Sequence, residues 1–252
     1  MVNMTHVQTD LIYSYEPAGF FESEVVIETP SGTLKVGSGK AILTLSHPVK
    51  VSHAMAEQIT DIVRGVFSAQ QLFNHMQFEL REHNVLYIGP DDHREISILV
   101  KPAHFKLTTY PVDIRLTDAT GRVIKDSRAE RIAQQSKFVQ NISTKLSNPA
   151  LLRMLASYNA AVNDSTNELV HLFEILDALI DHFGKEGSAR SALDITKEEW
   201  DRIGKLANGE PILEGRHRGN KPSLRPATDD ELLAARKMAF KLIERFADSV
   251  TE

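Results

Sequence analysis

Side chains that can hold an anion are concentrated in one loop near the C-terminus, between residues 214 and 225. Four basic residues and one acidic residue give this loop a local formal charge of +3, in a chain whose net charge is -5. They are Arg216, Arg218, Lys221, Arg225 and Glu214. The planar fork of arginine suits phosphate oxygens, and lysine adds a point charge. The pattern predicts a site for a phosphate-bearing polyanion, and we call this segment the basic loop.

Three neighbouring residues complete the candidate site. His217 lies between two arginines, whose positive charges disfavour its protonation. Asn208 is predicted to orient the loop through its amide, and Trp200 to pack beneath it. The predicted ligand-binding residues are Asn208, Arg216, His217, Arg218 and Lys221. The alternative is structural: the arginines would pair with acidic residues of the helical region, such as Glu174, Asp177 and Asp181.

The Leu-Ala-Asn sequence at 206–208, the Arg216-His217 pair and a long final helix resemble the C-terminal part of uncharacterised bacterial all-helical domains. More weakly, they resemble the HEPN superfamily of helical bundles. The HEPN resemblance implies RNA binding or metal-independent RNA cleavage, often in dimers, with an Arg and a His four to six residues apart. The matching positions here are Asn208, Arg216 and His217. Because Arg216 and His217 are adjacent, and adjacent side chains do not share a helix face, the resemblance implies binding rather than cleavage. A ribonuclease with Arg216 as transition-state stabiliser and His217 as general acid/base is the catalytic alternative.

A polar stripe on the helix that follows Ser165 is the second candidate site. The stripe contains Glu168, His171, Glu174, Asp177, and Asp181 or His182. Glu168 and His171 have the Glu-x-x-His spacing of di-iron bundles, which also need such a pair on a second helix. The other such pair in the helical half runs from Glu214 to His217 in a loop. We therefore interpret the stripe as a solvated face and expect no metal.

Several chemistries are excluded or disfavoured. The chain has no cysteine, so disulfides, thiolate metal sites and cysteine nucleophiles cannot form. The Gly37-Ser38-Gly39-Lys40 sequence lacks the first Gly and the Ser or Thr of a phosphate loop, where Leu34 and Ala41 stand. It is better interpreted as a β-turn. No dinucleotide fingerprint or nucleophile elbow occurs, so no cofactor is expected.

Helical periodicity dominates the chain from Ser127 onward. Three capping boxes, which satisfy free N–H groups at helix starts, are predicted at Ser165–Glu168, Thr196–Glu199 and Thr228–Glu231. Asn148-Pro149 interrupts the first apolar stripe, and Gly184 is expected to end the helix that Ser165 begins. These signals predict a helical bundle over residues 127–252.

Residues 1–126 show the alternation typical of strands, with one helix from Ser52 to about Phe73. Strands are expected at 21–29, 33–36, 41–45, 76–80, 85–88, 95–101, 105–109, 112–117 and 122–125, with a turn between Leu80 and Val85 and a hairpin loop at 118–121. Residues 1–20 are interpreted as an irregular arm. The fold class is therefore α+β: an antiparallel-sheet domain with one long helix at 1–126, and an all-α bundle at 127–252.

Composition and segment lengths predict a soluble, cytoplasmic protein. No segment approaches the ~18 apolar residues of a membrane helix, and the N-terminus lacks the pattern of a secretory signal. The leading hypothesis is RNA or other polyanion binding by the basic loop. The alternative from another class is a protein–protein interaction module or homodimer without catalytic activity, in which the loop makes interface salt bridges.

Overall fold

The computed structural model describes residues 7–89, 94–98, 113, 115–117, 122–216 and 223–250. The chain divides into two compact units. The N-terminal unit comprises Met1–Gln70 and Phe78–Thr144, and the helical unit comprises Gln71–Gln77 and Lys145–Glu252. An antiparallel sheet with a long helix in the first unit, and helices in the second, confirm the predicted α+β fold class.

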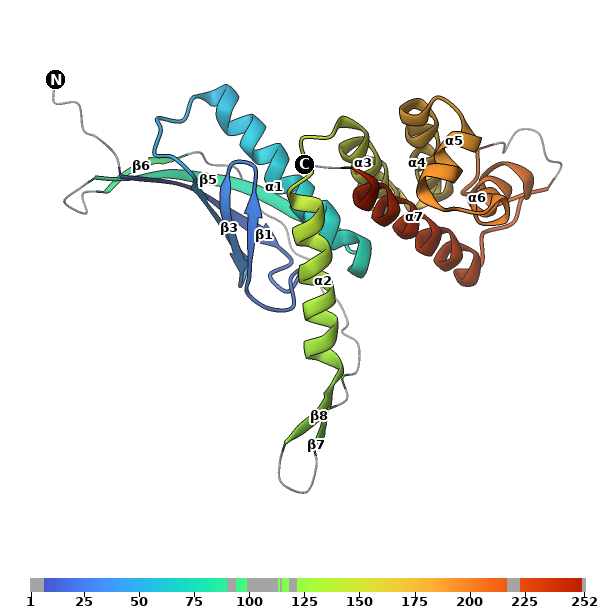
Figure 1. Cartoon of the computed structure of the whole chain (residues 1–252), viewed down its shortest axis with the longest axis horizontal. Helices are drawn as coiled ribbons and strands as arrows, with labels where there is room; N and C mark the ends of the chain where they lie inside the picture. The colour runs from blue at the N-terminus through green and yellow to red at the C-terminus, as the bar shows by residue number, and fades with distance from the viewer. Residues whose placement is uncertain are drawn as a thin grey trace. The chain divides into compact units, whose positions relative to one another are not determined.

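The N-terminal unit is built on a six-stranded antiparallel sheet with strand order β2-β3-β4-β1-β5-β6 (Figure 1). The strands are β1 (Gln8–Glu16), β2 (Val25–Thr29), β3 (Gly32–Gly37), β4 (Lys40–Leu45), β5 (Glu79–Ile88) and β6 (Arg94–Ile98). Inward residues alternate along these strands, as in β3, where Gly32, Leu34 and Val36 are buried.

The prediction that residues 1–20 form an irregular arm is wrong, because β1 lies inside the sheet between β4 and β5. The strand was missed because Thr9 and Asp10, which are polar, are buried on it. The Thr9 hydroxyl donates to the Val49 carbonyl at 3.1 Å and accepts from the Val49 amide at 3.2 Å. A partner forty residues away cannot be inferred from local alternation.

The predicted turn between Leu80 and Val85 is also wrong, since β5 runs without interruption from Glu79 to Ile88. The irregularity is a register shift against β1 at Ile12/Tyr13, which the sheet absorbs without ending the strand. The turn predicted at Gly37–Lys40 is confirmed: Ser38 and Gly39 have φ of 51° and 77° between β3 and β4. The strand predicted at 105–109 lies outside the described residues.

Helix α1 (His53–Asn74) covers the sheet with an aromatic core, and the Ser52 hydroxyl accepts from the Met55 amide at its start. Phe67 is fully buried at the centre of this core. Its ring centroid lies 5.0–5.6 Å from those of four aromatic residues: Tyr15, Phe20, Phe21 and Phe78. Such edge-to-face and offset contacts add to the burial of apolar area.

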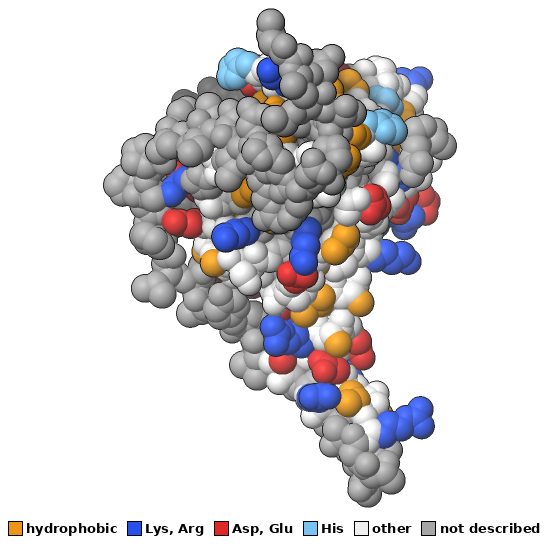
Figure 2. Space-filling model, turned by 90° about the vertical axis from the view of Figure 1, so that its left-hand side faces the viewer, with side chains coloured by type: hydrophobic (Ala, Val, Ile, Leu, Met, Phe, Trp, Pro, Cys, Tyr) orange, Lys and Arg blue, Asp and Glu red, His pale blue; other side chains and the backbone are white. Residues whose placement is uncertain are grey.

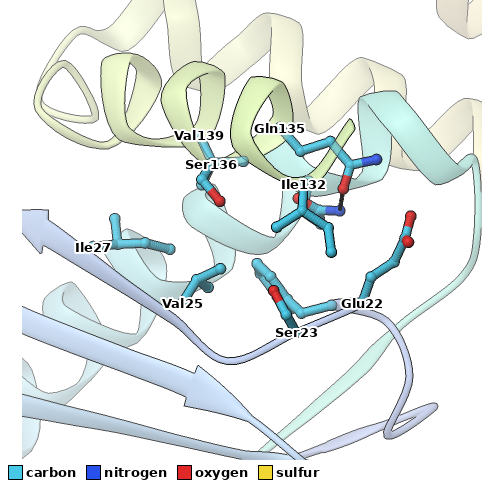
Figure 3. A pocket seen from close by; sticks show the side chains of 10 residues that line it. Glu22, Ser23, Val25, Ile27, Ile132, Gln135, Ser136 and Val139 are labelled. Carbon is cyan, nitrogen blue, oxygen red and sulfur yellow. Dashed lines mark hydrogen bonds between the residues drawn. The ribbon is translucent and has the colours of Figure 1, made fainter. Parts of the chain in front are cut away.

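Helix α2 (Ser127–Ser143) packs beside β2 (Figure 3), where Ile132 and Val139 face Val25 and Ile27. The void between them is about 10 Å³, at most the space of one water. The Gln140 side chain accepts from the Glu28 amide at 3.0 Å and donates to the Glu28 carbonyl at 3.1 Å. Strand β2 lies at the edge of the sheet. The Gln140 side chain therefore occupies the Glu28 N–H and C=O groups, which another strand could otherwise pair with.

The helical unit contains five α-helices within the described residues: α3 (Pro149–Asn163), α4 (Glu168–Phe183), α5 (Glu186–Leu193), α6 (Lys197–Gly204) and α7 (Asp229–Ser249). A π-helical turn, Lys205–Gly209, extends α6. Asn148 caps α3, and Gly184 ends α4 with φ of 82°. The capping boxes predicted at Thr196 and Thr228 are both confirmed.

The division between the units falls after α2, between Thr144 and Lys145, whereas the sequence predicted a boundary at residue 126. The change from strand to helix periodicity marks a change of secondary structure, but α2 buries Phe138, Val139 and Ile142 in the N-terminal unit. None of the helices in the described ranges is both long enough and apolar enough to cross a membrane.

Candidate functional site

The basic loop is anchored at its two ends by backbone hydrogen bonds within the helical unit. The Arg216 amide donates to the Ala207 carbonyl at 2.7 Å, which ties the loop to the π-helical turn. The Leu213 amide donates to the Arg225 carbonyl, and the Arg225 amide to the Pro211 carbonyl, both at 2.9 Å. The loop is therefore fixed by backbone hydrogen bonds at Arg216 and at Arg225, on the two sides of residues 217–224.

Arg225 has a structural role in this anchor. Its guanidinium donates two hydrogen bonds to the Glu231 carboxylate at 2.8 and 2.7 Å. The same carboxylate accepts from the Thr228 amide as the capping box of α7. The pKa of Glu231 is lowered to about 2, mainly by the hydrogen bonds from Arg225 and next by the hydrogen bond from the Thr228 amide. One of the four basic residues of the loop, which was not among the predicted ligand-binding residues, thus holds the start of α7.

Arg216 is placed differently. Its guanidinium carbon lies 4.3 Å from the centroid of the Phe173 ring on α4, a cation–π contact. Its Nη1 is 3.6 Å from Asp177 Oδ2, which is longer than a hydrogen bond. The side chain is 37% exposed and that of Asp177 46%. Within the described ranges, Asp177 is the one ion-pair partner of Arg216. The alternative in which the arginines of the loop pair with acidic residues of the helical region is therefore met by Arg216 only through this long contact.

The other predicted residues have different outcomes. Asn208 lies in the π-helical turn, and its Oδ1 is buried with no hydrogen-bond partner among the described residues. Trp200 is 4% exposed and belongs to the core of the helical unit. His217, Arg218 and Lys221 lie outside the described residues. The structure therefore joins the Arg216 backbone to the turn that contains Asn208, through the hydrogen bond to Ala207.

Gly215 is required where the loop meets the π-helical turn. A Cβ at this position would lie 2.8 Å from the Ala207 carbonyl oxygen and 3.2 Å from that of Ile212. Both neighbours are backbone atoms, so an added methyl group can only be accommodated if the loop moves.

The Gly215→Ala variant is accordingly expected to lose about 1–2 kcal/mol of stability in the helical unit, as the Arg216–Ala207 hydrogen bond weakens. Chemical denaturation followed by Trp200 emission measures this loss. Gly209→Ala is the matched control, since its Cβ would meet only Lys205 Cγ at 3.7 Å. An equal loss in both variants would contradict a specific role for Gly215.

A buried charged cluster in the same unit was not predicted. Glu168 is 1% exposed, and its carboxylate accepts two hydrogen bonds from Arg236 of α7, at 2.5 and 2.8 Å. His75 Nε2 lies 3.7 Å from Glu168 Oε1, and His75 Nδ1 lies 3.2 Å from the Tyr158 hydroxyl. Charged or polar groups on four segments of the unit thus meet in this cluster.

The capping box predicted at Ser165–Glu168 is wrong. Ser165–Asn167 form a 3-10 turn without a side-chain cap, and the Glu168 carboxylate pairs with Arg236 instead.

His75 is held in this cluster in an unusual state. Its backbone has φ of 48°, in the left-handed region that few non-glycine residues adopt. Burial, and then the positive charge of Arg236, lower the pKa of His75 to about 4, although Glu168 opposes the shift. The imidazole is therefore neutral at physiological pH, in contact with an ion pair and with the Tyr158 hydroxyl, whose pKa burial raises.

The helical unit is expected to lose stability as the pH falls from about 6.5 towards 4, because the unfolded chain protonates His75 before the folded unit does. The loss between pH 7 and 5 is about 1–2 kcal/mol, reduced because a quarter of the imidazole is exposed. Denaturation of wild type and His75→Asn at both pH values measures it; Asn tolerates the left-handed backbone but does not titrate. The same pH dependence in the variant would contradict this assignment.

The polar stripe on α4 does not behave as one solvated face. Glu168 is buried in the cluster, whereas His171 pairs with Asp164 at 3.5 Å and with Glu174 at 3.4 Å. Hydrogen bonds from Thr166 and Asn167 are the main cause that lowers the pKa of Asp164 to about 2. No group of three or more His, Asp or Glu side chains in the described part of the chain is placed to hold a metal ion.

No protein-family model, curated protein or solved structure matches the chain.

Proposed function

We propose that the helical unit binds a polyanion, and RNA in particular, through the basic loop. The main support for the proposal is the set of contacts that the Arg216 guanidinium makes. Its guanidinium is stacked on Phe173 and makes an ion pair of 3.6 Å, beyond hydrogen-bonding distance, with a half-exposed carboxylate. By contrast, the guanidinium groups of Arg225 and Arg236 each give two hydrogen bonds of 2.5–2.8 Å to a carboxylate.

This contrast separates arginines that hold the fold from one that can bind a ligand. A guanidinium fixed by an aromatic ring loses little conformational freedom when its N–H groups meet a phosphate. The phosphate would replace Asp177, whose contact with Arg216 is long and exposed to solvent. Arg216 begins a segment whose sequence continues with His217, Arg218 and Lys221, so several phosphates of one strand could be bound in succession.

RNA is favoured among polyanions because proteins recognise single strands by stacking bases on aromatic rings and on arginine planes. The Arg216–Phe173 stack supplies such a plane at the surface of the unit. Binding, rather than cleavage, is proposed, since Arg216 and His217 are adjacent in sequence and adjacent side chains do not share a helix face.

The test is binding of a labelled single-stranded RNA to wild type, Arg216→Ala and Arg216→Lys, measured by fluorescence anisotropy. We expect Arg216→Ala to weaken binding about 10-fold or more, and Arg216→Lys to restore it only partly, because lysine keeps the charge but not the fork or the stack. Arg202→Ala is the control: Arg202 is an exposed arginine of the same unit for which the structure shows no ion pair with a described residue.

Two outcomes would count against the proposal. Equal weakening by Arg202→Ala and Arg216→Ala would indicate attraction to the whole surface rather than to the loop. Heparin that competes as well as unlabelled RNA would support a general polyanion site and contradict a preference for RNA.

Protein–protein interaction is the second candidate function. It is favoured by two large apolar side chains on the surface of the helical unit, Leu213 at 44% and Leu233 at 46% exposed. Leu213 directly precedes the basic loop, and its amide donates to the Arg225 carbonyl at the end of that loop. An exposed apolar side chain at this place is typical of a surface that binds a partner. A folded wild type that does not bind RNA would direct the search to such a partner.

A further inference from the structure

Helix α4 places an aromatic ring and a carboxylate side by side at the Arg216 site. Phe173 and Asp177 are four residues apart, so their side chains lie on the same face of the helix. Arg216 contacts both: its guanidinium carbon lies 4.3 Å from the centroid of the Phe173 ring, and its Nη1 lies 3.6 Å from Asp177 Oδ2. A planar cation and an acidic side chain are therefore neighbours in the helical unit.

The Asp177 carboxylate differs from the other carboxylates of α4. Within the described part of the chain, each of the other three makes a hydrogen bond with an arginine or a histidine. They are Glu168, Glu174 and Asp181. Among the same residues Asp177 makes none, and its contact with Arg216 is longer than a hydrogen bond. Its side chain is half-exposed, so both oxygens can accept from a ligand.

We infer that Asp177 makes the Arg216 site selective for guanine in single-stranded RNA. Proteins bind unpaired bases by stacking them on aromatic rings or arginine planes and by hydrogen bonds to their pairing edges. A base stacks on the side of the Arg216 guanidinium opposite to Phe173, with its pairing edge towards Asp177. The phosphate that takes the N–H groups of Arg216 releases Asp177 from its long contact, and the carboxylate then binds the base.

The chemistry of the base edges selects guanine. An ionised carboxylate only accepts hydrogen bonds. Guanine presents two adjacent donors on its pairing edge, the ring N–H and the amino group, and the two carboxylate oxygens can accept one bond from each. Uracil presents a single N–H between two carbonyl oxygens. Adenine and cytosine each present a ring nitrogen beside the amino group, and the lone pair of that nitrogen is repelled by the carboxylate.

Overall charge does not provide such a preference. In Figure 2, basic and acidic side chains of the described residues are interspersed over the visible surface. The two-stranded ribbon of β7 (Arg115–Thr117) and β8 (Val123–Asp126) also mixes the two signs, with Arg115 3.6 Å from Asp126. Attraction of scattered charges to a phosphate backbone is independent of the base. A preference for one base therefore reports a local site.

This inference rests on the proposed function, because a base reaches Asp177 only when the strand is bound at Arg216. The test is the affinity of wild type for a short labelled oligouridine whose central nucleotide is guanosine, adenosine, cytidine or inosine, at one salt concentration. The guanosine oligonucleotide should bind at least about 5-fold more tightly than the adenosine one, at the lower end of what a bidentate pair with a base edge contributes. Inosine, which lacks the amino group, should lose most of this preference.

Two variants assign the preference to one residue. Asp177→Asn should abolish or reverse it, since an amide presents one donor and one acceptor, which match adenine rather than guanine. RNA binding itself should persist, because Arg216 is unchanged. Asp181→Asn is the matched control: it makes the same change one turn further along α4, at a more exposed carboxylate that pairs with Arg153, and should keep the preference.

The outcomes separate this inference from the proposed function. A wild type that binds the four oligonucleotides equally would overturn the guanine preference and leave RNA binding by the basic loop intact. Equal loss of the preference in Asp177→Asn and Asp181→Asn would overturn the role of Asp177 as the residue that reads the base. A folded wild type that binds none of the oligonucleotides would overturn both proposals.

Discussion

Replacing Glu168 by alanine is expected to lower the free energy of unfolding of the helical unit by about 3 kcal/mol, at the lower end of the range for a broken buried ion pair. The carboxylate is almost fully buried and takes both hydrogen bonds of the Arg236 fork. Without it, Arg236, whose side chain is only 28% exposed, keeps a positive charge with no partner in the cluster. The adjacent imidazole of His75 is neutral and cannot compensate.

The measurement is chemical denaturation followed by the emission of Trp200. It is the only tryptophan of the chain and is buried in this unit, so its signal reports the unit directly. Glu174→Ala on the same helix is the control; that side chain is 45% exposed, and its loss should cost no more than about 0.5 kcal/mol. The double variant Glu168→Leu/Arg236→Met should be more stable than Glu168→Ala, since no unpaired charge is left. A cost below about 1 kcal/mol for Glu168→Ala would contradict the role assigned to the cluster.

Replacing Phe67 by alanine should destabilise the N-terminal unit by about 3–5 kcal/mol. The ring is fully buried and contacts aromatic residues from β1, from the segment after it and from Phe78 before β5. Its removal would leave a cavity among rigid rings that cannot collapse to fill the space. Phe67→Leu, which keeps most of the volume, should cost about 1–2 kcal/mol.

Hydrogen exchange of amides in β1 and in the first half of α1 measures the stability of this unit, because Trp200 does not belong to it. Protection that is unchanged in Phe67→Ala would show that the aromatic cluster is not the core of the unit. Phe67→Ala and Glu168→Ala also serve as controls for each other, since each changes the core of one unit.

Features specified by neighbouring residues could be predicted from the sequence. The capping boxes at Thr196 and Thr228 form as expected because each involves residues only three positions apart. The left-handed turn at Ser38-Gly39 and the helix end at Gly184 follow from local backbone preferences. The alternation of helix and strand patterns was sufficient for the α+β class.

Features that depend on distant partners could not be predicted. Glu168 fits a capping box locally, but a bond to Arg236, sixty-eight residues later, overrides it. Strand β1 looked polar because its buried Thr9 is satisfied by Val49. In the basic loop, Arg216 was among the predicted ligand-binding residues and Arg225 was not, but the sequence could not show what Arg225 does instead. The tertiary structure shows it, because Glu231 occupies the fork of Arg225 whereas Phe173 supports Arg216.

The salt dependence of single-stranded RNA binding, in wild type and in an Arg216→Ala/Arg218→Ala double variant, tests the central claim most directly. We predict that wild type binds with an affinity that falls steeply as salt rises. The double variant should bind more weakly, with a slope less steep by about 1.4, which corresponds to two lost phosphate contacts on a single strand. Its Trp200 emission should match wild type. A folded wild type without salt-dependent RNA binding, or a double variant with the same affinity and slope, would contradict the account.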